Sequence, residues 1–140
     1  MSTELLIDSS QNGSRIALLK DKSLVELHTE EDDSKFKVGD IYLGTVRKIV
    51  NGLNAAFIDV GYEKDAFLHY QDLGPQINSL IKYIKLLKNN NSSLFNLKGF
   101  DQEPDIEKLG KISQVLSKNN QILVQVVKEP ISTKGPRLSC

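Results

Sequence analysis

The chain has 140 residues, 39% of them hydrophobic, and its 18 basic and 18 acidic residues cancel to a net charge of zero. This length fits one domain, or one domain and part of another, and the balanced charge argues against a generic binder of polyanions. A single cysteine, Cys140, excludes a disulfide framework or a four-cysteine zinc site within one chain.

The charges are unevenly distributed along the chain. Residues 1–40 contain 5 Lys/Arg and 9 Asp/Glu, whereas residues 41–140 contain 13 and 9. No apolar run approaches the roughly 20 residues that cross a membrane, and the N-terminus lacks the basic start and apolar stretch of a signal peptide. We therefore expect a cytoplasmic protein without a membrane partner.

The first 35 residues predict a small meander followed by an acidic connection. Residues 4–8, 15–19 and 24–27 have strand composition, with Asn12-Gly13 as the first turn. Such a meander is marginal unless it packs on something else. Residues 28–35 are polar, and the four acids at 30–33 lack the spacing of a calcium loop, which favours a solvated linker.

Residues 39–74 contain three strand-like runs, 40–50, 54–60 and 64–70, separated by glycine-containing turns. They predict a tight antiparallel meander in which side chains alternate between two faces. One face would carry Ala56, Ile58, Val60, Ala66, Leu68 and Tyr70, and the other Ala55, Phe57, Asp59, Phe67 and His69.

Two interpretations of the aromatic face remain open. Phe57 and Phe67 could cover a second apolar layer, as aromatics often do in small β domains. Alternatively, the rings form a platform on which unpaired bases stack, with basic side chains nearby. The candidate cations are Arg47, Lys48, Lys64, Lys128, Lys134 and Arg137.

The second half predicts a helix, an irregular insertion and two further strands. Apolar residues from Ile77 to Leu87 recur at helical spacing and Pro75 suits a first helical position, which predicts about three turns, with lysines on a solvated face. Residues 89–110 show no sustained period and predict a mobile insertion, and residues 111–116 a helical turn. Residues 121–128 form the clearest strand, and residues 137–140 begin another.

The fold class expected is therefore mainly β: a five-stranded antiparallel OB-fold barrel with an inserted helix, preceded by the short meander. A closed barrel also removes exposed strand edges. Strand spacing alone leaves a small β sandwich as an alternative.

Four separated motifs point to a known family. They are Gly39-Asp-Ile-Tyr-Leu-Gly-Thr-Val-Arg-Lys-Ile, Asn54-Ala-Ala-Phe-Ile-Asp-Val-Gly61, Asp65-Ala-Phe-Leu-His69 and Gln125-Val-Val-Lys-Glu-Pro-Ile-Ser-Thr-Lys-Gly-Pro-Arg-Leu138. In order and spacing the chain resembles the N-terminal part of the bacterial ribonuclease E/G family. The resemblance implies an RNA-binding OB-fold of the ribosomal-protein S-one type over residues 37–140, with an insertion at about 75–118. It also implies that residues 1–36 are the leading strands of a divided RNase H-like domain.

The resemblance further implies which residues contact single-stranded RNA. Phe57 and Phe67 match the two stacking aromatics, and Lys134 matches a lysine in the loop before the last strand. His69 shares their face, where a purely structural role is nearly as well supported. Three further basic residues, without motif support, are plausible phosphate contacts: Lys64, Arg47 and Arg137.

The expected function is therefore single-stranded RNA binding, as the substrate-binding segment of an endoribonuclease that acts in RNA processing and decay. The expected partners are RNA and the remainder of the ribonuclease chain. We expect no catalytic residue, metal ligand or cofactor within residues 1–140, and no RNA cleavage by this segment alone. The magnesium implied for the family lies further along the chain. The alternative function is a protein-interaction or self-assembly module that uses the aromatic face and the N-terminal strands.

Overall fold

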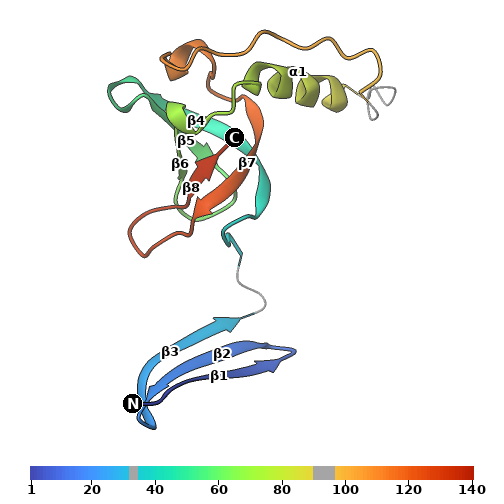
Figure 1. Ribbon diagram of the computed structural model, residues 1–140. Coiled ribbons are helices and arrows are strands. Elements are labelled where there is room, and N and C mark those ends of the chain that lie inside the picture. The colour runs from blue at the N-terminus through green and yellow to red at the C-terminus, as the bar shows by residue number, and fades with distance from the viewer. Residues whose placement is uncertain (32–34, 90–96) are drawn as a thin grey trace. The chain divides into compact units, whose positions relative to one another are not determined.

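The computed structural model describes residues 1–31, 35–89 and 97–140 (Figure 1). The chain divides into two compact units, Met1–Lys35 and Phe36–Cys140.

The first unit is an antiparallel sheet of β1 (Thr3–Ser10), β2 (Gly13–Lys20) and β3 (Ser23–Glu31) in that order. Its first turn is Gln11–Asn12, one residue earlier than predicted, because Gly13 already pairs with Ser10. Gly13 has a φ of +133°, and a Cβ there would lie 2.1 Å from the Glu30 carbonyl oxygen, so a glycine is required.

The acidic connection predicted to follow the sheet is partly strand. β3 continues through Glu31, whose partner in β2 is Gly13. Backbone pairing with β2 overrides the polar composition of this segment, since strand formation depends on the neighbouring strand more than on propensity. The acids at 32 and 33 lie outside the described residues.

Both faces of this sheet carry exposed aliphatic side chains. Leu5 and Ile7 pair with Leu18 and Ile16 on one face, whereas Leu6 lies on the other. Leu5, Leu6 and Ile7 are 60%, 54% and 64% exposed. Neither face of the sheet therefore contributes a closed core within this unit.

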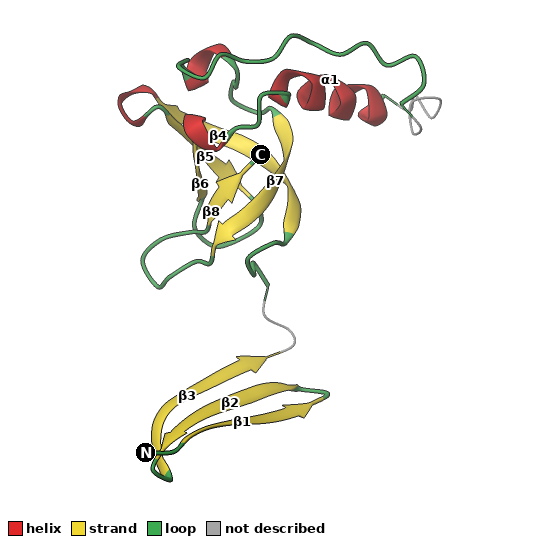
Figure 2. Cartoon of the chain, in the orientation of Figure 1, coloured by secondary structure: helices red, strands yellow, loops and turns green. Residues whose placement is uncertain are grey.

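The second unit is a closed barrel with strand order β4-β5-β6-β8-β7 (Figure 2). This confirms the prediction of a mainly β, five-stranded barrel. One pairing departs from the antiparallel expectation: β6 and β8 are parallel, through Phe67 and Arg137. The strands are β4 (Ile41–Val50), β5 (Ala55–Asp59), β6 (Ala66–His69), β7 (Gln121–Lys128) and β8 (Arg137–Ser139).

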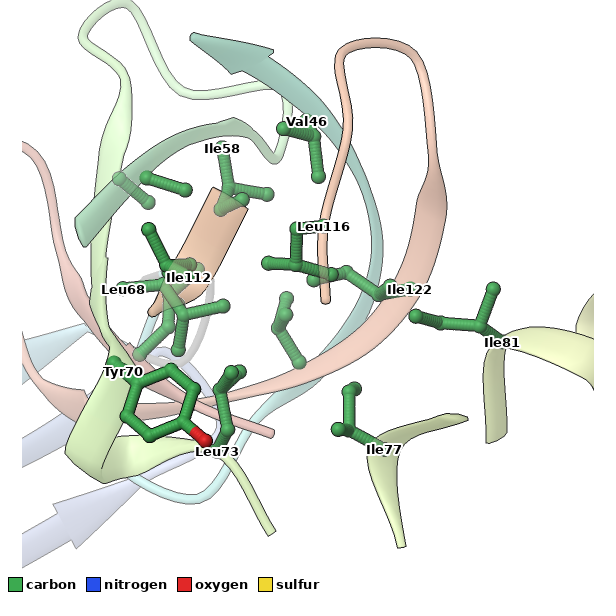
Figure 3. Close-up of a cluster of buried hydrophobic side chains, with 14 of the residues drawn as sticks. Val46, Ile58, Leu68, Tyr70, Leu73, Ile77, Ile81, Ile112, Leu116 and Ile122 are labelled. Atoms are coloured by element: carbon green, nitrogen blue, oxygen red, sulfur yellow. The ribbon is translucent and has the colours of Figure 1, made fainter. Parts of the chain in front are cut away.

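Aliphatic side chains fill the barrel, as alternation predicted (Figure 3). Val46, Ile58, Leu68 and Ile122 are fully buried. Ala55 was expected on the outer face but is also buried. The reason lies in Asn54, whose side-chain amide donates to the Gly110 carbonyl at 2.9 Å and accepts from the Ile112 N–H at 2.7 Å, so the segment around residue 111 lies against the start of β5.

Helix α1 (Ile77–Lys88) lies across one end of the barrel (Figure 1). It begins two residues after Pro75, and Ile77, Ile81 and Ile84 are its buried aliphatic residues. Short 3-10 turns are η1 (Asn51–Leu53), η2 (Tyr70–Asp72) and η4 (Ile112–Gln114), the last within the predicted helical turn. No helix in the described part of the chain is long and apolar enough to cross a membrane.

The insertion predicted to be mobile falls into two parts. Residues 90–96 lie outside the described residues. Residues 97–110 have no regular secondary structure but are bonded to α1. Ser79 Oγ accepts from the Glu103 N–H at 2.8 Å, Lys82 Nζ lies 3.1 Å from the Glu103 carboxylate, and the Phe100 ring contacts Tyr83 edge to face at 5.5 Å.

Candidate nucleic-acid interface

The two phenylalanines singled out by alternation are direct neighbours on the outer wall of the barrel. Phe57 in β5 pairs with Phe67 in β6, and their ring centroids lie 5.9 Å apart at an interplanar angle of 65°. Both side chains are half-buried, whereas Ile58 and Leu68 beside them are fully buried. The rings are therefore outside the core, as predicted. The rings meet edge to face, the arrangement that aromatic pairs favour.

A groove of about 680 Å³ opens over the two rings. One side is formed by Phe57 of β5, the start of β6 and the connection between these two strands. The other side is formed by the connection between β7 and β8, which Figure 1 draws at the end of the barrel away from α1. Four basic and two acidic side chains line it, so the groove has a positive excess. The lining residues are Phe57, Lys64, Asp65, Phe67, Lys128, Glu129, Ile131, Thr133, Lys134, Gly135 and Arg137.

The basic side chains fall into two groups by their contacts. The side chains of Lys128 and Lys134 are exposed and make no hydrogen bond or ion pair with any other described residue. Lys64 Nζ donates to the Ser132 carbonyl at 2.6 Å, and Arg137 Nη2 lies 2.9 Å from Asp72. Lys128 and Lys134 are therefore the groove cations most available to an anionic ligand.

Arg47 does not line the groove. It is the extra residue of a β-bulge in β4, since Val46 pairs with Ile58 and Lys48 with Phe57. Its guanidinium lies 2.7 Å from Asp59 and 3.2 Å from Asp65. The hydrogen bond with Asp59 and the charge of Asp65 raise the pKa of Arg47. Arg47 is therefore already paired with two carboxylates of the barrel.

The pKa of Asp59 is lowered from its ordinary 3.8 by the Gly61 N–H and then by Arg47. Its contribution to stability is therefore full above about pH 4 and is lost as the pH falls through the lowered pKa. We expect Asp59→Asn to lower the free energy of unfolding by less than about 1 kcal/mol at neutral pH, because the pair is exposed. Urea unfolding should show this difference at about pH 6 and none at about pH 2. A difference that grows on acidification would contradict the assignment.

His69 shares the outer face but does not line the groove. Its Nδ1 accepts a hydrogen bond from the Gln71 N–H at 3.1 Å and so caps η2. This contact favours the structural alternative stated for His69.

Five groove residues were missed by the sequence reasoning. Glu129, Ile131, Thr133 and Gly135 lie in the connection between β7 and β8, and Asp65 lies in the connection between β5 and β6. No pattern in an irregular connection indicates which side chains turn toward a groove. The fourth motif spans the connection between β7 and β8, but the resemblance implied an RNA contact there only for Lys134.

The described residues contain no group of three or more His, Cys, Asp or Glu that could hold a metal ion. Asp59 and Asp65 both contact Arg47.

No family model matches the chain. Ribonuclease G of Haemophilus influenzae is 35% identical over 138 residues, which are 99% of this chain and 24% of that protein. Ribonuclease G of Escherichia coli is 31% identical over 139 residues, again 99% of this chain and 24% of the relative. Ribonuclease E of a Synechocystis species is 38% identical over 104 residues, 74% of this chain and 11% of the relative.

The chain belongs to the ribonuclease E/G family. The resemblance carried by the four motifs is thereby confirmed. This ribonuclease E/G segment spans about a quarter of the length of the ribonuclease G relatives. It corresponds to an N-terminal segment of the family and contains the closed barrel with the groove.

Proposed function

We propose that this ribonuclease E/G segment binds single-stranded RNA in the groove, with bases stacked on Phe57 and Phe67. The observation that carries the proposal is the adjacency of two half-buried rings on the outer wall, in a groove with an excess of positive charge. Each base stacked on an aromatic ring is worth roughly 1–3 kcal/mol and tolerates any sequence, because every base has a π face.

The phosphates would then be held by Lys134 and Lys128, the groove cations without a protein partner among the described residues. Lys48, the cross-strand neighbour of Phe57, is exposed and adds charge beside that ring. Arg47 and Arg137 would contribute less, since each must compete with the carboxylates that it already contacts. Stacking positions the bases, and the lysines hold the backbone.

Lys134→Ala tests the phosphate contact. We expect weaker binding of single-stranded RNA and a salt dependence whose slope, log affinity against log salt, decreases by about 0.7, because one fewer counterion-releasing contact is made. Fluorescence anisotropy with a labelled ten-nucleotide RNA at several salt concentrations measures both quantities.

Lys118→Ala is the matched control. Lys118 is exposed and precedes β7, whereas the groove lies at the far end of that strand, so both affinity and slope should stay unchanged. Equal slopes for Lys134→Ala and the unaltered chain would remove Lys134 from the phosphate contacts.

In the whole protein, we propose that this segment presents RNA to a hydrolytic centre in the cytoplasm during RNA processing and decay. The support is the family, since the relatives are named as ribonucleases. Magnesium and the groups that hold it would belong to the remainder of the protein.

The exposed aliphatic side chains of the N-terminal sheet indicate that it belongs to a larger domain. Leu5 and Leu6 are adjacent and point to opposite faces, and both are more than half exposed. A sheet that is apolar on both faces is typical of the interior layer of a larger domain. We propose that residues 1–36 are the leading strands of a divided RNase H-like domain completed by the remaining ribonuclease chain. Concentration-dependent sedimentation together with absence of RNA binding would favour the self-assembly alternative instead.

A further inference from the structure

Lys134 is the last residue of a short turn whose two backbone hydrogen bonds join residues of the turn to each other. We call residues 131–134 the Lys134 turn. The Ile131 N–H donates to the Lys134 carbonyl at 3.1 Å, and the Lys134 N–H donates to the Ile131 carbonyl at 3.2 Å. Within the described part of the chain, no other backbone hydrogen bond attaches this turn to a neighbouring element. Its position over the groove must therefore come from other contacts.

Two contacts join the Lys134 turn to the connection between β5 and β6. The Lys64 ammonium donates to the Ser132 carbonyl at 2.6 Å, across 68 positions of sequence. Next to the turn, Gly135 lies so close to this connection that a Cβ would be 2.3 Å from the Asp65 carbonyl oxygen and 2.8 Å from that of Lys64. Gly135 brings the two backbones together, and Lys64 supplies the hydrogen bond that holds the turn there.

We propose that Lys64 is a positioning residue: its ammonium latches the Lys134 turn to the groove and sets the place of Lys134. This role differs from the direct phosphate contact that the sequence analysis gave as plausible for Lys64. An ammonium already engaged by a carbonyl gains less from a phosphate than a free one, because it must give up that bond. The hydrogen bond and the close backbone approach support the latch by themselves, whereas its effect on RNA rests on the proposed function.

The latch is tested without RNA by the exchange of amide hydrogens with solvent, followed by NMR. In Lys64→Met, which keeps the aliphatic stem and removes the donor, the amides of Ile131 and Lys134 should exchange about three- to tenfold faster, as expected for loss of one hydrogen bond. Lys64→Arg keeps a donor and should restore most of the protection. Lys118→Met is the matched control and should leave both amides unchanged. Unaltered exchange in Lys64→Met would overturn the latch.

The effect on RNA is tested by a double-mutant cycle on the 140-residue chain, with a labelled ten-nucleotide RNA. If Lys64 acts through Lys134, Lys64→Met should weaken binding about threefold in the unaltered chain and by less than about 1.5-fold in the Lys134→Ala background. Equal losses in the two backgrounds would show an independent contact and overturn the positioning role. Absence of any RNA binding by the unaltered chain would contradict the proposed function, and the exchange measurement would still decide the latch.

Discussion

Replacing both Phe57 and Phe67 by alanine is expected to weaken binding of single-stranded RNA by about 30-fold or more. Two stacking contacts, each worth roughly 1–3 kcal/mol, are removed at once. The barrel should stay folded, because both rings are half-buried on its outer wall and the core lies beneath them. Fluorescence anisotropy measures the affinity, and circular dichroism checks the fold.

Two controls separate stacking from apolar contact and from the loss of any aromatic ring. Leucine at both positions keeps most of the apolar volume but removes the π face, so affinity should stay low. Phe100→Ala removes a ring that contacts Tyr83 of α1. Because Phe100 does not line the groove, affinity should be retained. Unchanged affinity in the Phe57→Ala/Phe67→Ala chain would reject the platform.

The second large effect is expected in the barrel core. Leu68→Ala should lower the free energy of unfolding by about 2–5 kcal/mol, because its side chain is fully buried within the aliphatic cluster and truncation leaves a cavity. The four tyrosines all lie between residues 42 and 83 and the chain has no tryptophan, so tyrosine fluorescence during urea unfolding reports on the barrel unit.

Leu123→Ala is the matched control for Leu68→Ala. Leu123 lies on the outward face of β7 and is 39% exposed, so the same truncation should cost less than about 1 kcal/mol. Similar losses for the two variants would contradict the assignment of inner and outer faces.

The inner and outer faces could be predicted because β5 and β6 alternate cleanly. Ile58 and Leu68 are buried and Phe57 and Phe67 are outside, as a period of two requires when one face packs on a core. Small residues give no such signal. Ala55 is buried by contacts around Asn54 that join segments 56 and 58 residues apart, and no local pattern contains that information.

The connection between β7 and β8, which forms one side of the groove, was less predictable than the two phenylalanine rings beneath it. The parallel contact between β6 and β8 joins residues 70 positions apart, at Phe67 and Arg137, and it brings the Lys134 turn beside the rings. Which cations remain available also depends on tertiary contacts. Arg47 lies at a β-bulge that no sequence pattern predicts, and its side chain contacts two carboxylates. The Lys64 ammonium donates a hydrogen bond to the Ser132 carbonyl.

The most direct test of RNA binding on the outer wall is an NMR titration of the amide resonances of residues 1–140 with a ten-nucleotide single-stranded RNA. The shifts should concentrate on β5, β6 and the connection between β7 and β8, with the amides of Phe57, Phe67 and Lys134 among the most affected. Shifts confined to α1 or to the N-terminal sheet, or a spectrum unchanged by RNA, would contradict it.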